Sequence, residues 1–139
     1  MIPTIDILTQ EITEQTHPSR TYRIVVNKDS STAATDRIDG FTDDLESVKQ
    51  AIYLILSTER YQYLLYSWDY GVELIDLIGK PMPYVMSEVP RRIKDALTQD
   101  NRIKDVIDFE FQVNKHKLHT TFTVVTDIGD ISTELEVDV

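Results

Sequence analysis

The sequence predicts an α+β fold in which about three helices pack on a C-terminal three-stranded antiparallel meander, with a small hairpin and an arm at the N-terminus. Two observations predict this class. Apolar residues recur at steps of three and four within residues 43–97, which is the spacing of helices buried on one side. From residue 107 onward the spacing changes to alternation, which is typical of half-buried strands. One face of such a sheet needs cover, and the helices supply it.

The N-terminal part of the chain predicts an arm followed by a hairpin. Residues 1–20 are polar with scattered Ile and Leu, and we expect them to order only against something else. Residues 21–26 and 37–41 predict two short strands joined by the polar loop 27–35. We expect residues 21–139 to form a single domain, since the length suits one hydrophobic core.

The first helix is predicted from Asp43. This residue is a good N-cap, and Glu46 stands at the position that completes a capping box. The helix is expected to end near Ser57 or Thr58. Its buried stripe is predicted to comprise Leu45, Val48, Ala51, Ile52 and Ile55.

An aromatic stretch follows within residues 58–80, and it includes Trp68, which is the only tryptophan. Leu64, Tyr66, Trp68 and Tyr70 occupy alternate positions, which favours an extended and half-buried segment. We expect Trp68 to be buried as part of an aromatic core. The alternative is a protein-interface anchor, since Tyr and Trp are enriched in interfaces.

Two further helices are expected before the sheet. Helical spacing after Gly71 and a stop at Gly79 predict a short helix with the apolar residues Val72, Leu74, Ile75 and Ile78. Ser87 is then expected to cap a third helix with Pro90 in its first turn. A longer helix that begins at Pro83 and is kinked at Pro90 is the alternative. The buried side of the third helix is predicted to comprise Val89, Ile93, Ala96 and Leu97.

Three alternating apolar rows predict the strands of the meander. Turns are expected at 114–117 and 127–130. The rows are Ile107, Phe109, Phe111 and Val113, then Leu118, Thr120, Phe122 and Val124, then Ile131, Leu135 and Val137.

Composition excludes several classes of partner and site. The formal net charge of −10 argues against nucleic acid, because phosphate binding needs a basic face. The sequence has no Cys, which excludes disulfides and thiol chemistry. No apolar run is long enough to span a membrane, and the N-terminus lacks the pattern of a signal peptide, so we expect synthesis in a cytoplasm.

A local cluster of basic residues has two interpretations. It is either a solvated surface or a docking patch for an acidic protein. The cluster consists of Arg91, Arg92, Lys94, Arg102 and Lys104.

Candidate catalytic and metal-binding residues have no distinctive spacing. His116 and His119 with Asp127 offer metal ligands, but the sequence has no zinc-type His spacing on a helix, so we interpret them as solvated residues of a hairpin turn. The carboxylates around the aromatic stretch leave a cell-wall glycosidase as an alternative function. They are Glu59, Asp69, Glu73 and Glu88. We therefore expect no catalytic, cofactor or metal site.

Three runs of sequence resemble a known family. They are VKQAIYLILSTERYQYLLYSWDYGVELIDLIGK at 48–80, SEVPRRIKDAL at 87–97 and DNRIKDVIDFEF at 100–111. The chain resembles the baseplate wedge, or sheath-initiator, proteins of contractile phage tails, also called the GpW/phage-lysozyme-like family. The version that it resembles is that of Gram-positive prophages of the PBSX type.

The resemblance implies a structural protein without catalysis, located in the baseplate of a virion or tail particle and made in the cytoplasm of the bacterial host. It implies several copies in a symmetric assembly, with other wedge proteins, the tail sheath protein and central hub or tube proteins as partners. It also implies that a strand of the sheath protein joins an edge of the sheet. That edge is expected at the last strand, at Ile131, Thr133, Leu135 and Val137.

The resemblance further implies a partner contact just before the sheet. The family has a Glu-Pro-Arg signature there, and this chain has Asp100, Asn101 and Arg102. Together with Arg91 and Arg92 these residues are the expected contacts with wedge partners. The alternative for Arg102 is a local ion pair with a neighbouring carboxylate. A stand-alone binding module stays open as a further alternative to the structural role.

Overall fold

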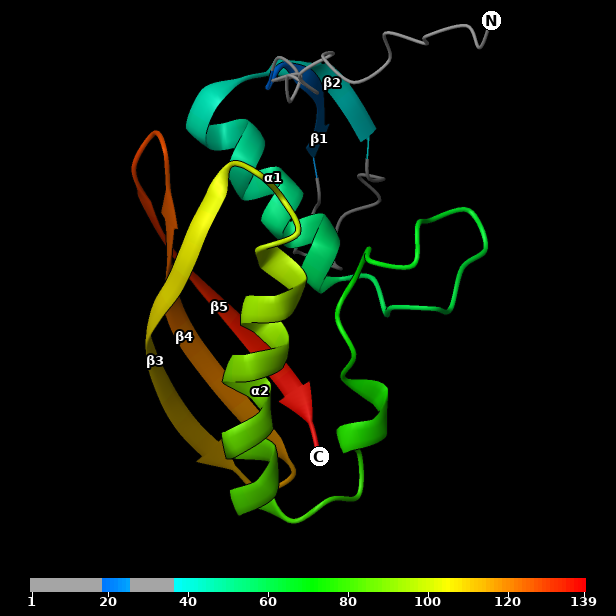
Figure 1. Ribbon diagram of the computed structural model, residues 1–139, viewed down its shortest axis with the longest axis vertical. Helices are drawn as coiled ribbons and strands as arrows, with labels where there is room; N and C mark the ends of the chain where they lie inside the picture. Colours follow the sequence, from blue (N-terminus) through cyan, green and yellow to red (C-terminus); the bar gives the residue numbers. More distant parts are fainter. Residues whose placement is uncertain (1–18, 26–36) are drawn as a thin grey trace, which may run out of the picture.

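The computed structural model describes residues 19–25 and 37–139, and it is an α+β fold. The expected loop 27–35 and most of the expected arm lie outside the described residues. In chain order the elements are β1 (Thr21–Val25), β2 (Arg37–Thr42), α1 (Asp44–Leu56), η1 (Ile75–Leu77), α2 (Met82–Leu97), β3 (Ile103–Asn114), β4 (Lys117–Thr126) and β5 (Asp130–Asp138). Figure 1 shows α2 lying along one face of the sheet formed by β3, β4 and β5.

The C-terminal meander is confirmed. Its strands are antiparallel in the order β3-β4-β5, with β4 in the centre. Alternate residues of β4 are buried against the helices, as the sequence predicts. The core beneath α1 and α2 includes Val48, Ile52, Val89, Ile93, Leu97, Leu118, Phe122, Val124, Ile131 and Val137.

The first half of β3 departs from the predicted alternation. Val106 is buried, and Ile107 is 39% exposed, although the sequence predicts Ile107 in the core row. The register with β4 shifts between Ile107 and Glu110, where Asp108 has a φ of 57°. Such a bulge inserts an extra residue and changes which face the following side chains occupy. It returns Phe109 and Phe111 to the core side.

Helix α1 begins and ends where the sequence predicts. Asp43 is its N-cap and accepts a hydrogen bond from the Asp44 N–H at 2.8 Å. Glu46 pairs with Lys49 at 2.8 Å on the exposed side. Ser57 is the C-cap.

Helix α2 is the longer of the two helices that the sequence allows. It starts at Met82 with Pro83 in its first turn, so the predicted start at Ser87 is wrong. Pro90 lies inside the helix. Pro83 has no backbone N–H. This loss costs little in the first turn, because the N–H groups there have no partner within the helix.

Only one short turn forms where the second helix is expected, after Gly71. Segment η1 has three residues, so the described part of the chain has two α-helices rather than about three. The Glu59 carboxylate accepts the N–H groups of Leu74 at 2.9 Å and Ile75 at 3.1 Å, which fixes the start of this turn. Asp76 is drawn to Arg92 on α2. These contacts with Glu59 and with α2 fix η1 in place. They explain why the segment forms one short turn although its apolar spacing is helical.

The predicted burial of Trp68 is wrong. Its side chain is 81% exposed, and the extended segment expected around it is a series of turns. Residues 61–70, here called the aromatic loop, project away from the helices and the sheet (Figure 1). The loop is aromatic in composition but contributes only Tyr70, its last residue, to the edge of the core.

The N-terminal hairpin is confirmed. Strands β1 and β2 pair antiparallel with Tyr22 opposite Phe41, and the two rings stack at 5.0 Å. The Gln50 side chain on α1 accepts the Ile24 N–H at 2.9 Å and donates to the Tyr22 carbonyl at 2.7 Å. A single amide thus holds β1 against α1 as a neighbouring strand would.

Candidate functional site

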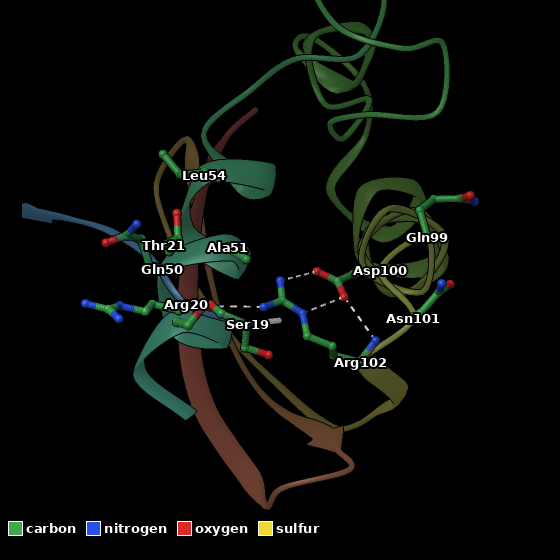
Figure 2. Close-up of a pocket in the computed structure, with 11 residues that line it drawn as sticks. Ser19, Arg20, Thr21, Gln50, Ala51, Leu54, Gln99, Asp100, Asn101 and Arg102 are labelled. Carbon is green, nitrogen blue, oxygen red and sulfur yellow. Dashed lines mark hydrogen bonds and ion pairs between the residues drawn. The ribbon is translucent and has the colours of Figure 1, made fainter. Parts of the chain in front are cut away.

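A cleft of about 460 Å³ opens where α2 gives way to β3, and we call it the corner cleft (Figure 2). Its walls come from three segments that are distant in sequence. They are Ser19, Arg20 and Thr21 at the start of β1, Ser47, Gln50, Ala51 and Leu54 on α1, and Gln99, Asp100, Asn101 and Arg102 before β3.

The turn that carries Asp100, Asn101 and Arg102 is tightly fixed. The Asp100 N–H donates to the Leu97 carbonyl at 3.1 Å, and the Ile103 N–H donates to the Asp100 carbonyl at 3.0 Å. At the other end, the Arg102 carbonyl accepts the Asp127 N–H. The three residues are therefore presented on a rigid corner between a helix and a sheet.

Arg102 and Asp100 form a two-pronged ion pair. The Arg102 Nε and Nη2 donate to separate oxygens of the Asp100 carboxylate, at 3.0 and 2.7 Å. The Arg102 backbone N–H adds a third bond to the carboxylate. The side chains are only 29% and 17% exposed, so the pair is partly shielded from water. This is the local ion pair that the sequence offers as an alternative.

The guanidinium also reaches across the cleft to α1. Arg102 Nη1 donates to the Ser47 Oγ at 3.4 Å, and the Ser47 hydroxyl itself donates to the Ser19 carbonyl. Ser47 is 1% exposed. A buried serine on α1 thus links the start of β1 to the corner, a connection that the sequence pattern does not reveal.

Opposing influences set the ionisation of Asp100. Burial raises the pKa of its carboxyl, but the hydrogen bonds and charge of Arg102 outweigh burial and hold that pKa below its ordinary value. The same pair raises the pKa of Arg102. Both groups are therefore charged at neutral pH. Most of the residues that line the cleft carry hydroxyl, amide or guanidinium groups, which suit recognition of a polar protein segment.

Arg91 and Arg92, the other two arginines expected at partner contacts, differ in exposure and in ion-pair partners. Arg92 is 10% exposed, and its guanidinium contacts Asp76, Glu88 and the Glu73 carbonyl. It therefore joins η1 to α2 within the chain. Arg91 is 67% exposed and pairs with Glu88 at 2.5 Å, so its guanidinium is the one that a partner can reach.

The expected sheet edge is at β5, which has no neighbour beyond β4 among the described residues. Ile131 and Val137 are buried, and Leu135 is partly buried against the core. These side chains face α1 and α2, while the alternate residues of β5 face the open side of the sheet.

The acidic residues considered for catalysis serve the fold or lie at the surface. Glu59 holds the start of η1, and Glu88 pairs with both arginines of α2. Within 19–25 and 37–139 no group of three His, Asp or Glu side chains is arranged to hold a metal ion, so His116, His119 and Asp127 are not gathered into a site. No helix in these ranges has the length and apolarity needed to cross a membrane.

Comparison with known proteins gives two matches. The family model for the contractile injection system sheath initiator matches residues 20–129. The chain is also 40% identical over 93 residues to the phage-like element PBSX protein XkdS of Bacillus subtilis (strain 168). That match covers 65% of this chain and 66% of the relative, just under two thirds of its length. Both matches agree with the resemblance that the sequence runs carry.

Proposed function

Because this chain belongs to the family of contractile injection system sheath initiators, we propose that it is a structural baseplate protein of a contractile tail and that sheath assembly starts on it. In this role it performs no catalysis and resides in the tail particle. Residues 21–139 act as one baseplate domain, and residues 1–20 act as an arm.

The observation that carries this proposal is the regular edge of β5, which has no neighbouring strand beyond β4 among the residues that the structure describes. Consecutive residues from Asp130 to Asp138 pair with β4 without any shift of register. In an antiparallel pair, residues alternate between those bonded to the neighbouring strand and those that face away. A strand with its outward N–H and C=O groups unpaired is a template for another strand.

Two hydrogen bonds fix which residues face outward. The Val139 N–H donates to the His116 carbonyl, and the Thr126 N–H donates to the Gly129 carbonyl. These bonded pairs set the phase of the ladder, so Ile131, Thr133, Leu135 and Val137 bond inward to β4. The outward backbone groups belong to the alternate residues Asp130, Ser132, Glu134, Glu136 and Asp138. The residues expected at the edge thus point their side chains toward the core, and their neighbours supply the outward hydrogen-bonding groups.

The opposite edge of the sheet is less suited to strand addition. Strand β3 has register shifts between Ile103 and Asp105 and between Ile107 and Glu110. Bulges of this kind bend an edge and interrupt the even row of donors and acceptors. We therefore assign the sheath strand to β5.

The inner baseplate partners are assigned to the corner cleft. Asp100, Asn101 and Arg102 line it, and Arg91 lies on the exposed side of the adjacent helix. A partner that inserts an acceptor beside Arg102 would meet a guanidinium already oriented by Asp100. Other wedge proteins and central hub or tube proteins are the partners proposed here.

Removal of the chain from a complete tail gene cluster tests this function. We expect particles that keep the tube and lack polymerised sheath, and recovery of the sheath when the chain is supplied in trans. Electron microscopy of negatively stained particles gives the readout. Normal sheaths on particles without the chain would refute the proposal.

A further inference from the structure

The aromatic loop exposes six large apolar side chains on one projection. Leu64 is 107% exposed and Leu65 is 88% exposed. The set comprises Tyr61, Tyr63, Leu64, Leu65, Tyr66 and Trp68. Single exposed apolar residues are ordinary, but a contiguous group of this size marks an interaction site.

The loop is held in shape before any partner binds. At its stem the Arg60 N–H donates to the Val72 carbonyl at 3.1 Å, and the Val72 N–H donates to the Thr58 carbonyl at 3.0 Å. The Arg60 guanidinium ties the stem to Asp95 on α2 at 2.9 Å.

The rings of the loop also order one another. Tyr66 stacks on Tyr70 at 4.7 Å, and Tyr61 meets Trp68 edge to face at 6.0 Å. A preordered aromatic anchor loses little conformational entropy on binding, which favours a tight complex.

The exposed area matches that of a protein interface. Four of the six side chains are aromatic, and such side chains cover about 150–250 Å² each, so the six together present on the order of 800 Å² at this exposure. One partner of a standard interface buries about the same area. The loop therefore offers enough apolar surface for most of a stable contact.

The loop adjoins the corner cleft. A second cleft of about 340 Å³ lies between the loop and the ends of both helices. Its walls include Ser67, Asp69 and Tyr70 from the loop, and it shares Gln99 and Asp100 with the corner cleft. The two clefts meet at these shared residues, so one bound segment can contact the loop and the corner together.

We propose that the aromatic loop and the corner cleft form one docking surface, occupied by a segment of another baseplate subunit that is apolar over the loop and polar at the cleft. This inference rests on the proposed function, since it names a further contact of the same inner partner. Asp69 is the only charged side chain within residues 61–70, so the partner carries a basic group at the rim of its apolar surface.

Other occupants suit the surface less well. The loop has no Lys or Arg, and the chain has a net charge of −10, which opposes binding to anionic lipid. A second copy of this chain would have to receive the projecting apolar loop, and most of the residues that line its corner cleft are polar.

The test uses tails assembled from a complete gene cluster and measures how much of the chain is incorporated, by quantitative mass spectrometry. The loop variant carries Leu64→Ser, Leu65→Ser and Trp68→Ser. Its matched control carries three substitutions of apolar residues that are exposed elsewhere, and these are Ile38→Ser, Val113→Ser and Ile128→Ser. We expect incorporation to fall at least tenfold for the loop variant and less than twofold for the control.

A cleft variant separates this inference from the proposed function. Asn101→Arg fills the corner cleft, and Asn114→Arg adds the same group at an exposed position of β3 as its control. We expect Asn101→Arg to lose incorporation with the loop variant. A defect in only one of these two variants would overturn the joint surface and leave the structural role in place. Normal incorporation of both, with sheath still formed on particles that lack the chain, would overturn both proposals.

A photoreactive residue identifies the occupant. With benzoylphenylalanine at position 64, we expect a covalent adduct with a different baseplate subunit in assembled tails. An adduct only with a second copy of this chain would contradict the inference. Binding of the free chain to phosphatidylcholine and phosphatidylglycerol vesicles, abolished in the loop variant, would also contradict it.

Discussion

The Arg102 guanidinium donates two hydrogen bonds to the Asp100 carboxylate at the corner where α2 passes into β3. The N–O distances are 3.0 and 2.7 Å. The pair lies in the wall of the corner cleft, so it stabilises the turn and also shapes the proposed contact with a partner (Figure 2). The two interpretations of Arg102 that the sequence leaves open are therefore compatible. A variant of Arg102 is expected to affect both stability and assembly.

Arg102→Ala is expected to lower the free energy of unfolding by about 1–3 kcal/mol, because it leaves a partly buried carboxylate without its charged donor. Arg102→Lys should recover part of this loss, since an ammonium group cannot bond two oxygens in a planar fork. Arg91→Ala is the control, and its pair with Glu88 should contribute little because the Arg91 guanidinium is exposed to water. Urea unfolding measures all three. Equal stability of Arg102→Ala and wild type would show that the ion pair with Asp100 does not stabilise the fold.

The Asp100 pair is also expected to weaken in acid. The folded-state pKa of Asp100 is lowered, so its contribution is complete above the ordinary Asp pKa of about 3.9 and is lost as pH falls through the lower folded value. The stability difference between wild type and Asp100→Asn should therefore be constant from pH 5 to 7 and shrink below about pH 4. Urea unfolding across this range measures it. A difference that stays constant down to pH 2.5 would show that the charge of Asp100 is not involved.

Thr120→Val is expected to stabilise the chain. Thr120 is fully buried on β4, and its hydroxyl has no hydrogen-bond partner in the part of the chain that the structure describes. Valine therefore keeps the shape and removes the cost of burying that oxygen. The expected gain is about 1 kcal/mol. Thr123→Val on the half-buried, open side of β4 serves as the control and should change stability by less than about 0.5 kcal/mol. Thermal unfolding of both variants gives the comparison. A lower unfolding temperature for Thr120→Val would show that the Thr120 hydroxyl stabilises the fold.

Gly71→Ala is expected to open the stem of the aromatic loop. Gly71 has a φ of 98°, and a Cβ there would lie 2.6 Å from the Thr58 carbonyl oxygen. Gly79 has a similar φ of 81° with open space around it, so Gly79→Ala carries only the backbone strain of about 1–2 kcal/mol. Gly71→Ala should cost clearly more and should speed hydrogen exchange at the Val72 amide. Equal costs for the two variants would mean that the close approach at the stem is easily relieved.

Much of the sheet and of α1 could be predicted because each has a simple period and clear ends. Alternation identified the strands of the meander, and Asp43 identified the start of α1. The period fails at Ile107 because a bulge at Asp108 depends on pairing with β4 and leaves no local signal. The start of α2 was ambiguous because Pro83 and Pro90 both suit a first turn.

Composition alone does not decide whether the aromatic stretch lies in the core or at the surface. Core and interface anchors use the same residues, and only the contacts of neighbouring segments decide between them. Here the stem is fixed by Glu59, Arg60 and Gly71, and the loop is left outside the core. The sequence predicts a partner contact at Arg102, but its pattern gives no sign of the cleft or of Ser47 and Gln50, which reach the cleft only through the tertiary fold.

The proposed attachment of the sheath to the outward edge of β5 can be tested with a pair of proline variants. Glu134 on β5 and Val113 on β3 each have a backbone N–H that faces away from β4, so proline removes an edge donor without breaking a bond of the sheet. Both side chains are exposed, and the two variants should unfold at similar temperatures.

In assembled tails we expect Glu134→Pro to enter the baseplate and leave the tube without polymerised sheath, while Val113→Pro supports sheaths of normal length. Electron microscopy of the two particle preparations decides the matter. Normal sheaths with Glu134→Pro, or bare tubes only with Val113→Pro, would contradict the assignment of the sheath strand to β5.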